Sequence, residues 1–561
     1  MKDEEESFIA RSSVLVFRTL RDVWLVWLLL AVLTTLPYVV AVLRTPSGSV
    51  FSGVLTAYDD TFTYFAWMRQ SADGHLLMCD LYTSESQSRE FFLPLWTALG
   101  LIARWTGAPI ALTFHAARLL AGLLLLIVAR AVARSVMKSR TRVRFSLWMF
   151  AMSGGLGWLI YALKNGSNLF GVSAASGSVD LNMPEAIAFR SVFAQVHFAV
   201  AVALVCGSIK FFFDALVEQK IRRALVAGAL VSLLAVVHPY LVVVVCAVAG
   251  AAAITLPLLI DKSRPRAFGF VALRAAVAFG TAATPGIAYV VYLSRSNEVL
   301  REWLRVTDTL SPAPWEYALG FGVVAALAIA GFRLMWTSRP RYGRPLLVWA
   351  VVQAALLYAP LSFQRRLVEG LQLPLSIAAS VAMFWIASRF IERPGVAPYR
   401  KIFFAGAIVF ASITNAGFVA AQLIARGPES GSADPRRYVP ADLIEAFDWL
   451  RTKSEPNAVL FSSYLTGNIA PSMTGLGVFL GHYGQTIRSD EKGAQVTAFF
   501  AGTLNDEAAR RLFAEHRVSY VIYGPFERAI SASFKPPGWL SLVCRVGDVE
   551  VFSVIEERAS D

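Results

Sequence analysis

The chain has 561 residues, of which 56% are apolar and 16% charged, and its mean hydropathy is +0.54. A soluble globular protein of this size does not reach such a balance, so the composition excludes that class and predicts an integral membrane protein. The net charge of +13 is also typical of nucleic-acid-binding proteins, but here the excess cations stand in short loops between hydrophobic runs. The four cysteines show no CxxC or Cys/His spacing, so neither a zinc site nor a disulfide scaffold is implied.

Hydrophobic runs of about 20 residues, the length that crosses a bilayer, fill the first three quarters of the chain. The acidic start MKDEEE has no short apolar core followed by a cleavage site, so we expect no removable signal peptide. The fifth run is short, and we expect it to form a tilted hairpin with the sixth that turns at His238 and Pro239. The eleven expected spans are residues 23–43, 109–133, 145–163, 189–213, 223–237, 240–260, 270–293, 316–336, 345–361, 372–390 and 402–424.

Loops rich in Lys and Arg alternate with loops that are poor in them, and the positive-inside rule assigns the basic set to the cytoplasm. This predicts a cytoplasmic N-terminus. The loops 44–108, 164–188, 294–315 and 362–371 and the C-terminal domain are then expected outside. The basic loops carry Arg18 and Arg21; Arg134, Lys138, Arg140, Arg142 and Arg144; Lys220, Arg222 and Arg223; Lys262, Arg264 and Arg266; Arg339, Arg341 and Arg344; and Arg389, Arg393, Arg400 and Lys401.

Two parts of the chain lie outside the spans. In the long first outer loop, residues 60–72 and 91–105 mix aromatic and apolar residues at helical spacing, which predicts two helices in the interface plane. After residue 426 the polar segment GPESGSADPRR predicts a linker. Beyond it, helical patterns (PADLIEAFDWLR, DEKGAQVTAFFAG, DEAARRLFAEH) alternate with strand patterns (AVLFSS, VSYVIYG). The fold class is therefore a polytopic helical domain, residues 1–426, followed by a three-layer α/β domain, residues 427–561.

Asp59 and Asp60, in the segment AYDDTFTYFAWMRQSADGHLL, stand just before the first of the two interfacial helices. Adjacent carboxylates at a water–membrane boundary can bind a divalent cation such as Mg²⁺ or Mn²⁺, or act as a general base toward a hydroxyl. One of them can equally well cap the helix, since Asp is a preferred N-cap. If the helix begins at Asp60, Asp59 is the cap and Asp60 the better candidate for a base.

Four of the ionisable residues at or within the spans are candidates for a function. Glu185 and Arg190, in DLNMPEAIAFRSVFAQVHF, fall near the outer end of the span 189–213, and His197 falls inside it. Along one continuous helix Glu185 and His197 would be about 18 Å apart, too far for one shared role. For His197, a hydrogen bond between helices and a function are both open. For His238, binding to carbonyls freed by Pro239 is favoured.

Arg365 and Arg366 form the only pair of arginines in the short outer loops. Positive charge is disfavoured on that side, so a compensating partner is expected, and a phosphate group matches guanidinium donors. Lipid headgroups are the alternative partner. In the C-terminal domain, polar residues that binding sites commonly use lie in or near expected loops: Tyr464, Asn468, His482, Tyr483 and Lys492.

With these features, the chain resembles the GT-C superfamily of membrane glycosyltransferases, which take sugars from polyprenyl-phosphate donors outside the cytoplasmic membrane. The resemblance covers the architecture of the whole chain. Its motifs are similar to those of bacterial members: YDD and DGHLL at 58–77, PEAIAFRSVFAQVHF at 184–198, HPY at 238–240, RRLVEGLQLPL at 365–375 and AVLFSSYLTGNIAPSMTGLGVFLGHYGQT at 458–486. The C-terminal domain lacks the WWDYG-type signature of the oligosaccharyltransferase branch, so transfer to an asparagine sequon is not implied.

The resemblance implies an inverting transfer of a sugar to an envelope glycan, lipid or protein, with Asp60 or Asp59 as the base or as ligands of a divalent cation. It places donor binding at Arg365, Arg366, Arg190 and His238, and an acceptor pocket at Glu185, His197, His482 and Tyr483. The competing class is a transporter or assembly subunit for a lipid-linked glycan. A transporter would more naturally show inverted repeats, which this sequence lacks.

Overall fold

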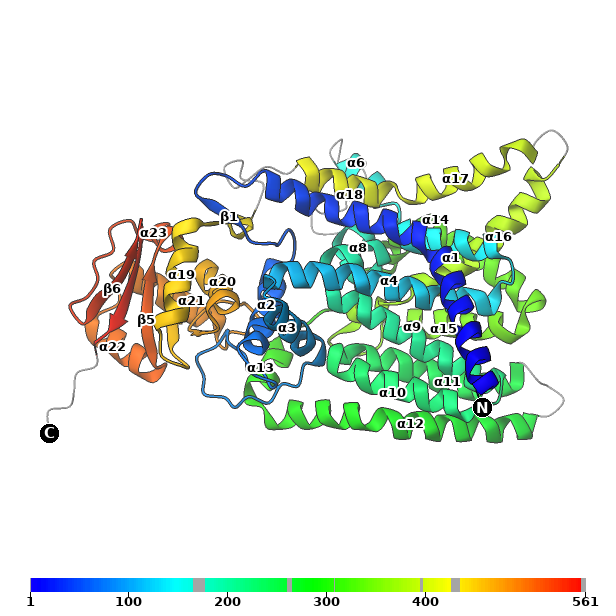
Figure 1. Cartoon of the computed structure of the whole chain (residues 1–561), viewed down its shortest axis with the longest axis horizontal. Helices are drawn as coiled ribbons and strands as arrows, with labels where there is room; N and C mark the ends of the chain where they lie inside the picture. Colours follow the sequence, from blue (N-terminus) through cyan, green and yellow to red (C-terminus); the bar gives the residue numbers. More distant parts are fainter. Residues whose placement is uncertain are drawn as a thin grey trace. The chain divides into compact units, whose positions relative to one another are not determined.

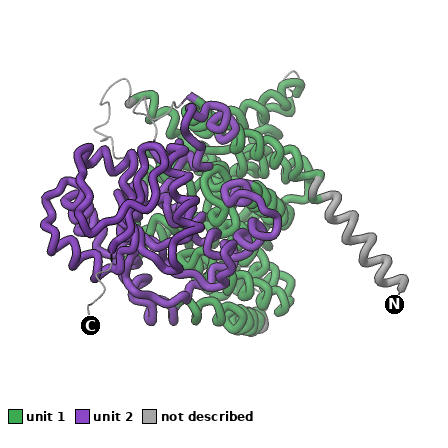
Figure 2. Tube along the Cα trace, turned by 60° about the vertical axis from the view of Figure 1, so that its left-hand side comes forward, with its two compact units in different colours: residues 1–37, 116–290, 309–423 green, residues 38–115, 291–308, 424–561 purple. Residues whose placement is uncertain are grey.

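The structure is a computed structural model that describes residues 2–164, 177–259, 265–306, 308–393, 397–424 and 434–555. Two compact units make up the chain (Figure 2). Unit 1 comprises Met1–Pro37, Ala116–Val290 and Thr309–Leu423, and unit 2 comprises Tyr38–His115, Val291–Asp308 and Ile424–Asp561. Unit 2 thus combines most of the long first loop with the C-terminal domain. The expected domain boundary at residues 426 and 427, and most of the expected linker, lie outside the described residues.

Unit 1 is helical (Figure 1). Three of its helices extend past the limits of the unit by several residues: α1 (Lys2–Leu43), α4 (Ile110–Val136) and α12 (Pro265–Ser296). The other α-helices are α5 (Arg140–Met152), α6 (Gly157–Lys164), α7 (Val179–Asn182), α8 (Ala188–Ala194), α9 (Val196–Val217), α10 (Ile221–Val237), α11 (Val242–Leu259), α14 (Pro314–Ser338), α15 (Pro340–Leu356), α16 (Gln372–Ile386), α17 (Arg400–Ala411) and α18 (Ile413–Ile424). Short turns of other helix types are η1 (Pro184–Ala186), η2 (Pro239–Leu241), η3 (Gln364–Val368), η4 (Ala387–Ile391) and η5 (Ala397–Tyr399).

Within the described residues, eight helices are long and apolar enough to cross a membrane, and α17 with α18, bent by 53°, makes a ninth. This confirms a polytopic membrane protein, with fewer full-length spans than the eleven expected. The difference comes chiefly from α10 and α15, which have 17 residues each. At 1.5 Å per residue each is about 26 Å long, short of the roughly 30 Å hydrocarbon core.

The expected helix 189–213 is broken in the structure. Pro184 begins the short turn η1, and Gln195 adopts an extended backbone (φ −144°, ψ 139°) between α8 and α9. Sequence pattern could not reveal this break because the residues on both sides of Gln195 are apolar. The argument that Glu185 and His197 are far apart along one helix is therefore wrong. The hairpin at His238 and Pro239 is confirmed, since α10 ends there and η2 leads into α11.

Unit 2 holds the sheets. Its α-helices are α2 (Tyr58–Ala72), α3 (Pro94–Thr106), α13 (Glu298–Val306), α19 (Ala441–Lys453), α20 (Tyr464–Thr474), α21 (Ser489–Phe500), α22 (Asp506–Glu515) and α23 (Pro525–Arg528), and it has the short turn η7 (Pro435–Arg437). Its strands are β1 (Ser49–Phe51), β2 (Tyr438–Pro440), β3 (Val459–Phe461), β4 (Gly477–Val478), β5 (Val518–Tyr523), β6 (Leu540–Val546) and β7 (Val549–Val554).

A five-stranded sheet with the order β4-β3-β5-β7-β6 forms the middle of the C-terminal part. Strands β4, β3 and β5 are parallel, whereas β7 and β6 form an antiparallel hairpin that turns at Gly547 (φ +51°). One face packs Phe461 against Phe499 and Phe513 of α21 and α22. The other face carries Tyr520, whose ring meets Trp449 of α19 at 6.3 Å. Helices therefore cover both faces, which confirms the three-layer α/β arrangement.

The first loop is built into the same unit as this sheet. Strand β1 of the loop pairs antiparallel with β2, with Val50 opposite Val439. The expected helices of the loop are confirmed as α2 and α3, and they pack closely, since a Cβ at Gly100 would lie 2.3 Å from the Met68 carbonyl oxygen. Helix α2 also packs on α20. This packing brings the start of α2 next to residues that follow it by almost 400 positions.

Candidate functional site

Helix α2 begins at Tyr58, earlier than the expected start at residue 60. Its N-cap is Ala57, which has a left-handed backbone (φ 50°, ψ 54°) and makes no side-chain capping bond. Neither Asp59 nor Asp60 therefore caps the helix with its side chain. The preference for Asp60 as a base rested on Asp59 being the cap, and that reason is wrong. Both carboxylates still lie in the first turn, where the helix dipole stabilises negative charge.

Asp59 is held by two partners from the C-terminal part of unit 2. Its Oδ1 accepts hydrogen bonds from Arg436 Nη1, at 2.9 Å, and from the Tyr464 hydroxyl. Arg436 also binds Asp434 and donates to the Asn468 side-chain oxygen at 2.8 Å. Burial acts to raise the pKa of Asp59, but the hydrogen bonds from Arg436 and Tyr464 outweigh it and hold the pKa below its ordinary value. Asp59 is therefore a fixed carboxylate whose charge is already neutralised.

Asp60 is in a different environment, with 47% of its side chain exposed. Its Oδ1 lies 3.8 Å from His482 Nε2. The Nδ1 atom of His482 accepts hydrogen bonds from the backbone N–H groups of Gly484 and Gln485, at 3.0 and 3.1 Å. The neutral ring must then carry its proton on Nε2, the atom that faces Asp60. Asp60 is thus an open carboxylate with a buried N–H donor behind it.

Asp80, which sequence reasoning missed, also lies in the surroundings of His482. Its Oδ1 accepts the backbone N–H of Tyr82 at 2.8 Å, and its Oδ2 is buried without a hydrogen bond. Burial raises the pKa of Asp80 to about 7, although the hydrogen bond from the Tyr82 backbone N–H and the charge of Lys492 act to lower it. No local pattern marks this residue, because its burial depends on the packing of the loop against α20 and the segment that follows it.

The polar residues expected in loops of the C-terminal domain are mostly on helices. Tyr464 and Asn468 belong to α20, and Lys492 belongs to α21, where its Nζ binds Glu85 at 2.9 Å. Sequence pattern did not predict α20, which Ser463 caps at its start and Gly475 ends with φ +79°. His482 and Tyr483 do lie in a loop, and their rings stack with centroids 5.0 Å apart.

The described side chains of this site do not form a preformed cage for a divalent cation. Among the residues that the structure describes, no group of three or more His, Cys, Asp or Glu side chains is placed to hold a metal ion. Asp59 already faces the cationic Arg436, and His482 presents a protonated nitrogen toward Asp60. Mg²⁺ is commonly bound by one or two carboxylates together with water and substrate phosphates, and Asp60 is the exposed carboxylate here that is available for such binding.

The second group of candidate residues lies in unit 1. Glu185 is 1% exposed, and its Oε1 lies 3.4 Å from Arg365 Nε and 3.8 Å from Arg366 Nη1. The arginine pair therefore has a carboxylate of the chain itself as a partner. The side chains of Arg365 and Arg366 remain 33% and 22% exposed, so Glu185 does not bury them.

His238 and His197 lie together in unit 1. His238 Nε2 binds Glu369 Oε1 at 2.8 Å, and Glu369 is completely buried. The expected partner of His238, a carbonyl freed by Pro239, is thus replaced by a carboxylate that sequence reasoning did not single out. The His197 ring lies 5.5 Å from the His238 ring.

Arg190 was expected to bind the donor, but its side chain contacts other groups of unit 1. Its guanidinium donates to the carbonyl oxygens of Asp180 and Leu181 at 3.4 and 3.2 Å. It also lies 3.6 Å from the centroid of the Phe418 ring. Through these contacts Arg190 packs α8 against α7 and against α18.

Solved structures show which fold this is. ArnT from Cupriavidus metallidurans, solved bound to undecaprenyl phosphate, matches with a TM-score of 0.54 at 13% identity, over 94% of this chain and 98% of that one. The oligosaccharyltransferase of Archaeoglobus fulgidus, tethered with an acceptor peptide containing the NVT sequon, matches with 0.51 at 12% identity, over 90% and 69%. The mycobacterial arabinofuranosyltransferase AftD matches with 0.51 at 14% identity, over 94% and 40%.

All three are GT-C glycosyltransferases. This chain has the GT-C fold. The GT-C architecture that the sequence resemblance implied is thereby confirmed. No protein-family model matches the sequence, and no curated protein matches it either. At 12 to 14% identity the structural similarity establishes the fold alone, so the function of this chain is argued from its own residues.

Proposed function

We propose that this chain is a membrane glycosyltransferase that transfers a sugar from a polyprenyl-phosphate-linked donor to a hydroxyl group of an acceptor. The observation that carries the proposal is the carboxylate pair of α2. Asp59 is neutralised by Arg436 and Tyr464, whereas Asp60 is left open to solvent. An enzyme that must deprotonate a hydroxyl needs an accessible carboxylate of this kind, and the GT-C fold is one that glycosyltransferases use.

Asp60 is the base of the proposed reaction. The acceptor oxygen forms a bond to the anomeric carbon while the bond from that carbon to the phosphate oxygen breaks on the opposite face. The anomeric configuration inverts, the polyprenyl phosphate leaves with the bonding electrons, and the hydroxyl proton passes to Asp60. The Nε2–H of His482 faces Asp60 and stabilises its carboxylate form before the proton arrives. No step passes through a divalent cation.

The phosphate of the donor is assigned to Arg365 and Arg366 in unit 1. Their side chains are partly exposed, and Glu185 faces both of them. Guanidinium groups can donate two parallel hydrogen bonds to phosphate oxygens and offset the charge that builds up on the leaving group. Polyprenyl phosphate as the carrier is supported by the neighbour ArnT, which was solved with undecaprenyl phosphate.

The location and the acceptor complete the proposal. The basic loops support an inner-membrane protein with its N-terminus in the cytoplasm and unit 2 outside. An extracytoplasmic glycan, lipid or protein is then the acceptor. Mg²⁺ or Mn²⁺ dependence is a separate question, tested by chelation followed by addition of each ion.

The deciding experiment is incubation of the purified full-length protein with a panel of polyprenyl-phosphate sugars, each with a simple alcohol acceptor. We expect release of polyprenyl phosphate and formation of an inverted glycoside from at least one donor. A flippase would instead move the lipid-linked sugar across a vesicle membrane without cleaving it. Translocation with no cleavage of any donor would therefore refute the enzyme.

A further inference from the structure

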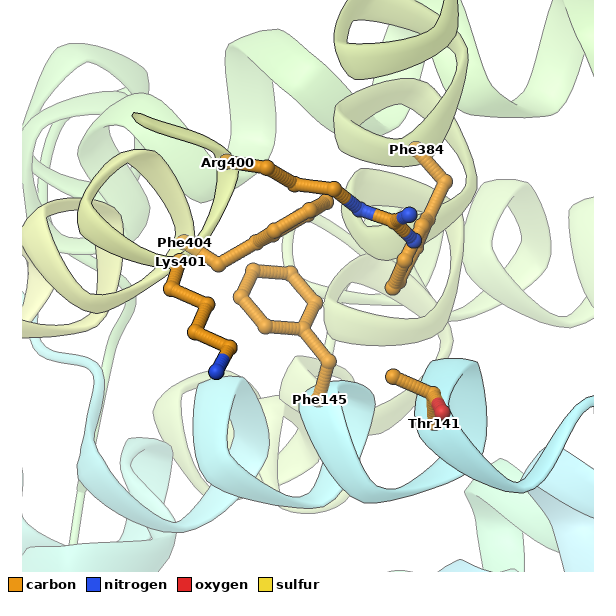
Figure 3. Close-up of a pocket in the computed structure, with 6 residues that line it drawn as sticks. All are labelled: Thr141, Phe145, Phe384, Arg400, Lys401 and Phe404. Carbon is orange, nitrogen blue, oxygen red and sulfur yellow. The ribbon is translucent and has the colours of Figure 1, made fainter. Parts of the chain in front are cut away.

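A cavity of about 400 Å³ lies in unit 1 (Figure 3). Helices α5, α16 and α17 form it. From Gln372 at the start of α16 to Phe384 in the wall of the cavity is about 18 Å of helix, so the cavity and Arg366 lie toward opposite ends of α16. Its lining residues are Thr141, Phe145, Phe384, Arg400, Lys401 and Phe404.

Three phenyl rings form the apolar wall of the cavity. The centroids of Phe145 and Phe404 are 4.9 Å apart, those of Phe384 and Phe404 are 4.6 Å apart, and those of Phe145 and Phe384 are 5.6 Å apart. The rings belong to a hydrophobic cluster shared by α5, α14, α16 and α17. This wall is suited to hydrocarbon rather than to a small hydrated anion.

Two cations of α17 line the edges of the cavity. In Figure 3 the Arg400 side chain extends above the Phe404 ring toward Phe384, whereas the Lys401 side chain extends to the left and below Phe404, beside Phe145. One nitrogen of Arg400 binds Glu392 at 3.1 Å, with both side chains largely exposed. Lys401 has no ion-pair or hydrogen-bond partner among the described residues. Arg142 adds a third positive charge, with its guanidinium 5.2 Å from the centroid of the Phe384 ring.

Two helices begin at this cavity. Helix α5 has 13 residues and starts at Arg140, and helix α17 has 12 residues and starts at Arg400. Neither start has a side-chain capping hydrogen bond. Thr141 lies in the first turn of α5, where the positive end of the helix dipole and the free N–H groups favour an anion. This dipole acts in the same direction as the side-chain charges of Arg400 and Lys401.

We propose that this cavity binds one anionic phospholipid of the membrane. The headgroup phosphate lies at Arg400 and Lys401, and the glycerol with the first acyl methylenes lies on the rings of Phe145, Phe384 and Phe404. A lipid fits better than a free phosphate because three aromatic rings face the space next to the cations. Helix α16 belongs to a candidate membrane span, and α17 belongs to the bent pair of helices that forms the ninth. This site does not depend on the proposed transferase activity.

The test measures lipid binding by native mass spectrometry of the full-length protein in detergent, with phosphatidylglycerol and phosphatidylcholine as probes. The wild type should bind one phosphatidylglycerol at least about tenfold more tightly than phosphatidylcholine. The double variant Arg400→Gln/Lys401→Gln should lose this preference. The matched control Arg222→Gln/Arg341→Gln removes the same charge from two exposed arginines outside the cavity and should keep it.

A second variant keeps the test decisive if removal of the cations impairs folding. Thr141→Trp fills the cavity without changing any charge and should also abolish the tight phosphatidylglycerol complex. Equal binding by the wild type and by both cavity variants would overturn the proposal, as would equal affinity for the two lipids. Full displacement of the lipid by millimolar inorganic phosphate would identify a free-anion site and overturn the lipid assignment.

Discussion

Asp59 and Asp60 are neighbours in the chain, yet their side chains lie in different environments. A guanidinium and a phenol bind Asp59, whereas Asp60 faces solvent with a single imidazole N–H 3.8 Å away. A base must exchange its proton with a substrate, and Asp59 cannot do so without giving up its hydrogen bonds. The two carboxylates are therefore expected to respond differently to the same substitution.

Asp60→Asn should reduce the rate of sugar transfer by roughly 100-fold or more, because the amide cannot accept the proton. The melting temperature should stay close to that of the wild type, since Asp60 is half exposed and caps no helix. Transfer rate is measured with the donor identified from the panel. Wild-type turnover by Asp60→Asn would remove Asp60 from the mechanism.

Asp59→Asn provides the matched comparison. Loss of the charge-assisted bond to Arg436, which is only 7% exposed, should reduce the free energy of unfolding by about 1 to 3 kcal/mol. Turnover per folded molecule should change much less than in Asp60→Asn. Denaturation curves and rates measured on the same preparations separate the two effects. The reverse pattern, a stable but inactive Asp59→Asn protein, would make Asp59 the base.

At the scale of elements, the turns η1 and η3 bring Glu185 next to Arg365 and Arg366. Replacing Arg365 and Arg366 by Gln should weaken the binding of undecaprenyl phosphate by roughly tenfold or more, because each charge-assisted hydrogen bond contributes about 1.5 to 3 kcal/mol. The same change leaves Glu185 buried without its cations, which should also destabilise the protein.

A triple variant separates these two consequences. Adding Glu185→Gln to the double variant should restore the melting temperature but not the affinity for undecaprenyl phosphate. Glu185→Gln alone should tighten that binding, since it frees both arginines for the phosphate. Affinity that returns with the triple variant would assign the pair to Glu185 alone. Both quantities are measured on purified protein in detergent.

The segment between α2 and α3 holds Asp80 and predicts a pH dependence. Burial raises the pKa of this carboxyl from 3.8 to about 7, so between about pH 4 and pH 7 the folded protein keeps a proton that the unfolded chain releases. The stability contributed by this group is full below about pH 4 and is lost as the pH rises through 7. Asp80→Asn mimics the protonated form. It should be more stable than the wild type at pH 8, by about 4 kcal/mol at most, and nearly equal to it at pH 4.

Unfolding curves at several pH values test this expectation. Asp548→Asn, at an exposed position, is the control and should follow the wild type at every pH. A stability difference between Asp80→Asn and the wild type that does not grow with pH would contradict a carboxyl that titrates near neutrality.

At the scale of the whole molecule, the open question is which side of the membrane each unit meets. The basic loops predict that the loop containing Ser139 is cytoplasmic and that the C-terminal domain containing Ser531 is external. In a variant with its four native cysteines replaced by Ser, an impermeant thiol reagent added to intact cells should label Ser531→Cys and not Ser139→Cys. The opposite labelling would reverse the topology and exclude Asp60 as a base for an external acceptor.

Local sequence pattern determined much of this protein, because helices, strands and spans depend on residues close together in the chain. Hydropathy predicted the membrane class, and the apolar and aromatic spacing predicted α2, α3, α19, α21 and α22. The alternation of helical and strand patterns predicted the three-layer domain. The sequence pattern failed at two places. At Gln195 the apolar sequence continues through a break between two helices. At α20 the pattern did not indicate a helix, although Ser463 caps its start and Gly475 ends it.

Tertiary structure alone decided which charges meet. Arg436 reaches Asp59 across 377 positions of sequence, and Glu369 reaches His238 across 131. The sequence places the two aspartates side by side and cannot distinguish them. The pairing of β1 with β2 and the packing of α2 on α20 bring a guanidinium to one and leave the other in water. Coulomb energies and desolvation depend on distance in space rather than along the chain, which is why only the folded structure separates a neutralised carboxylate from an open one.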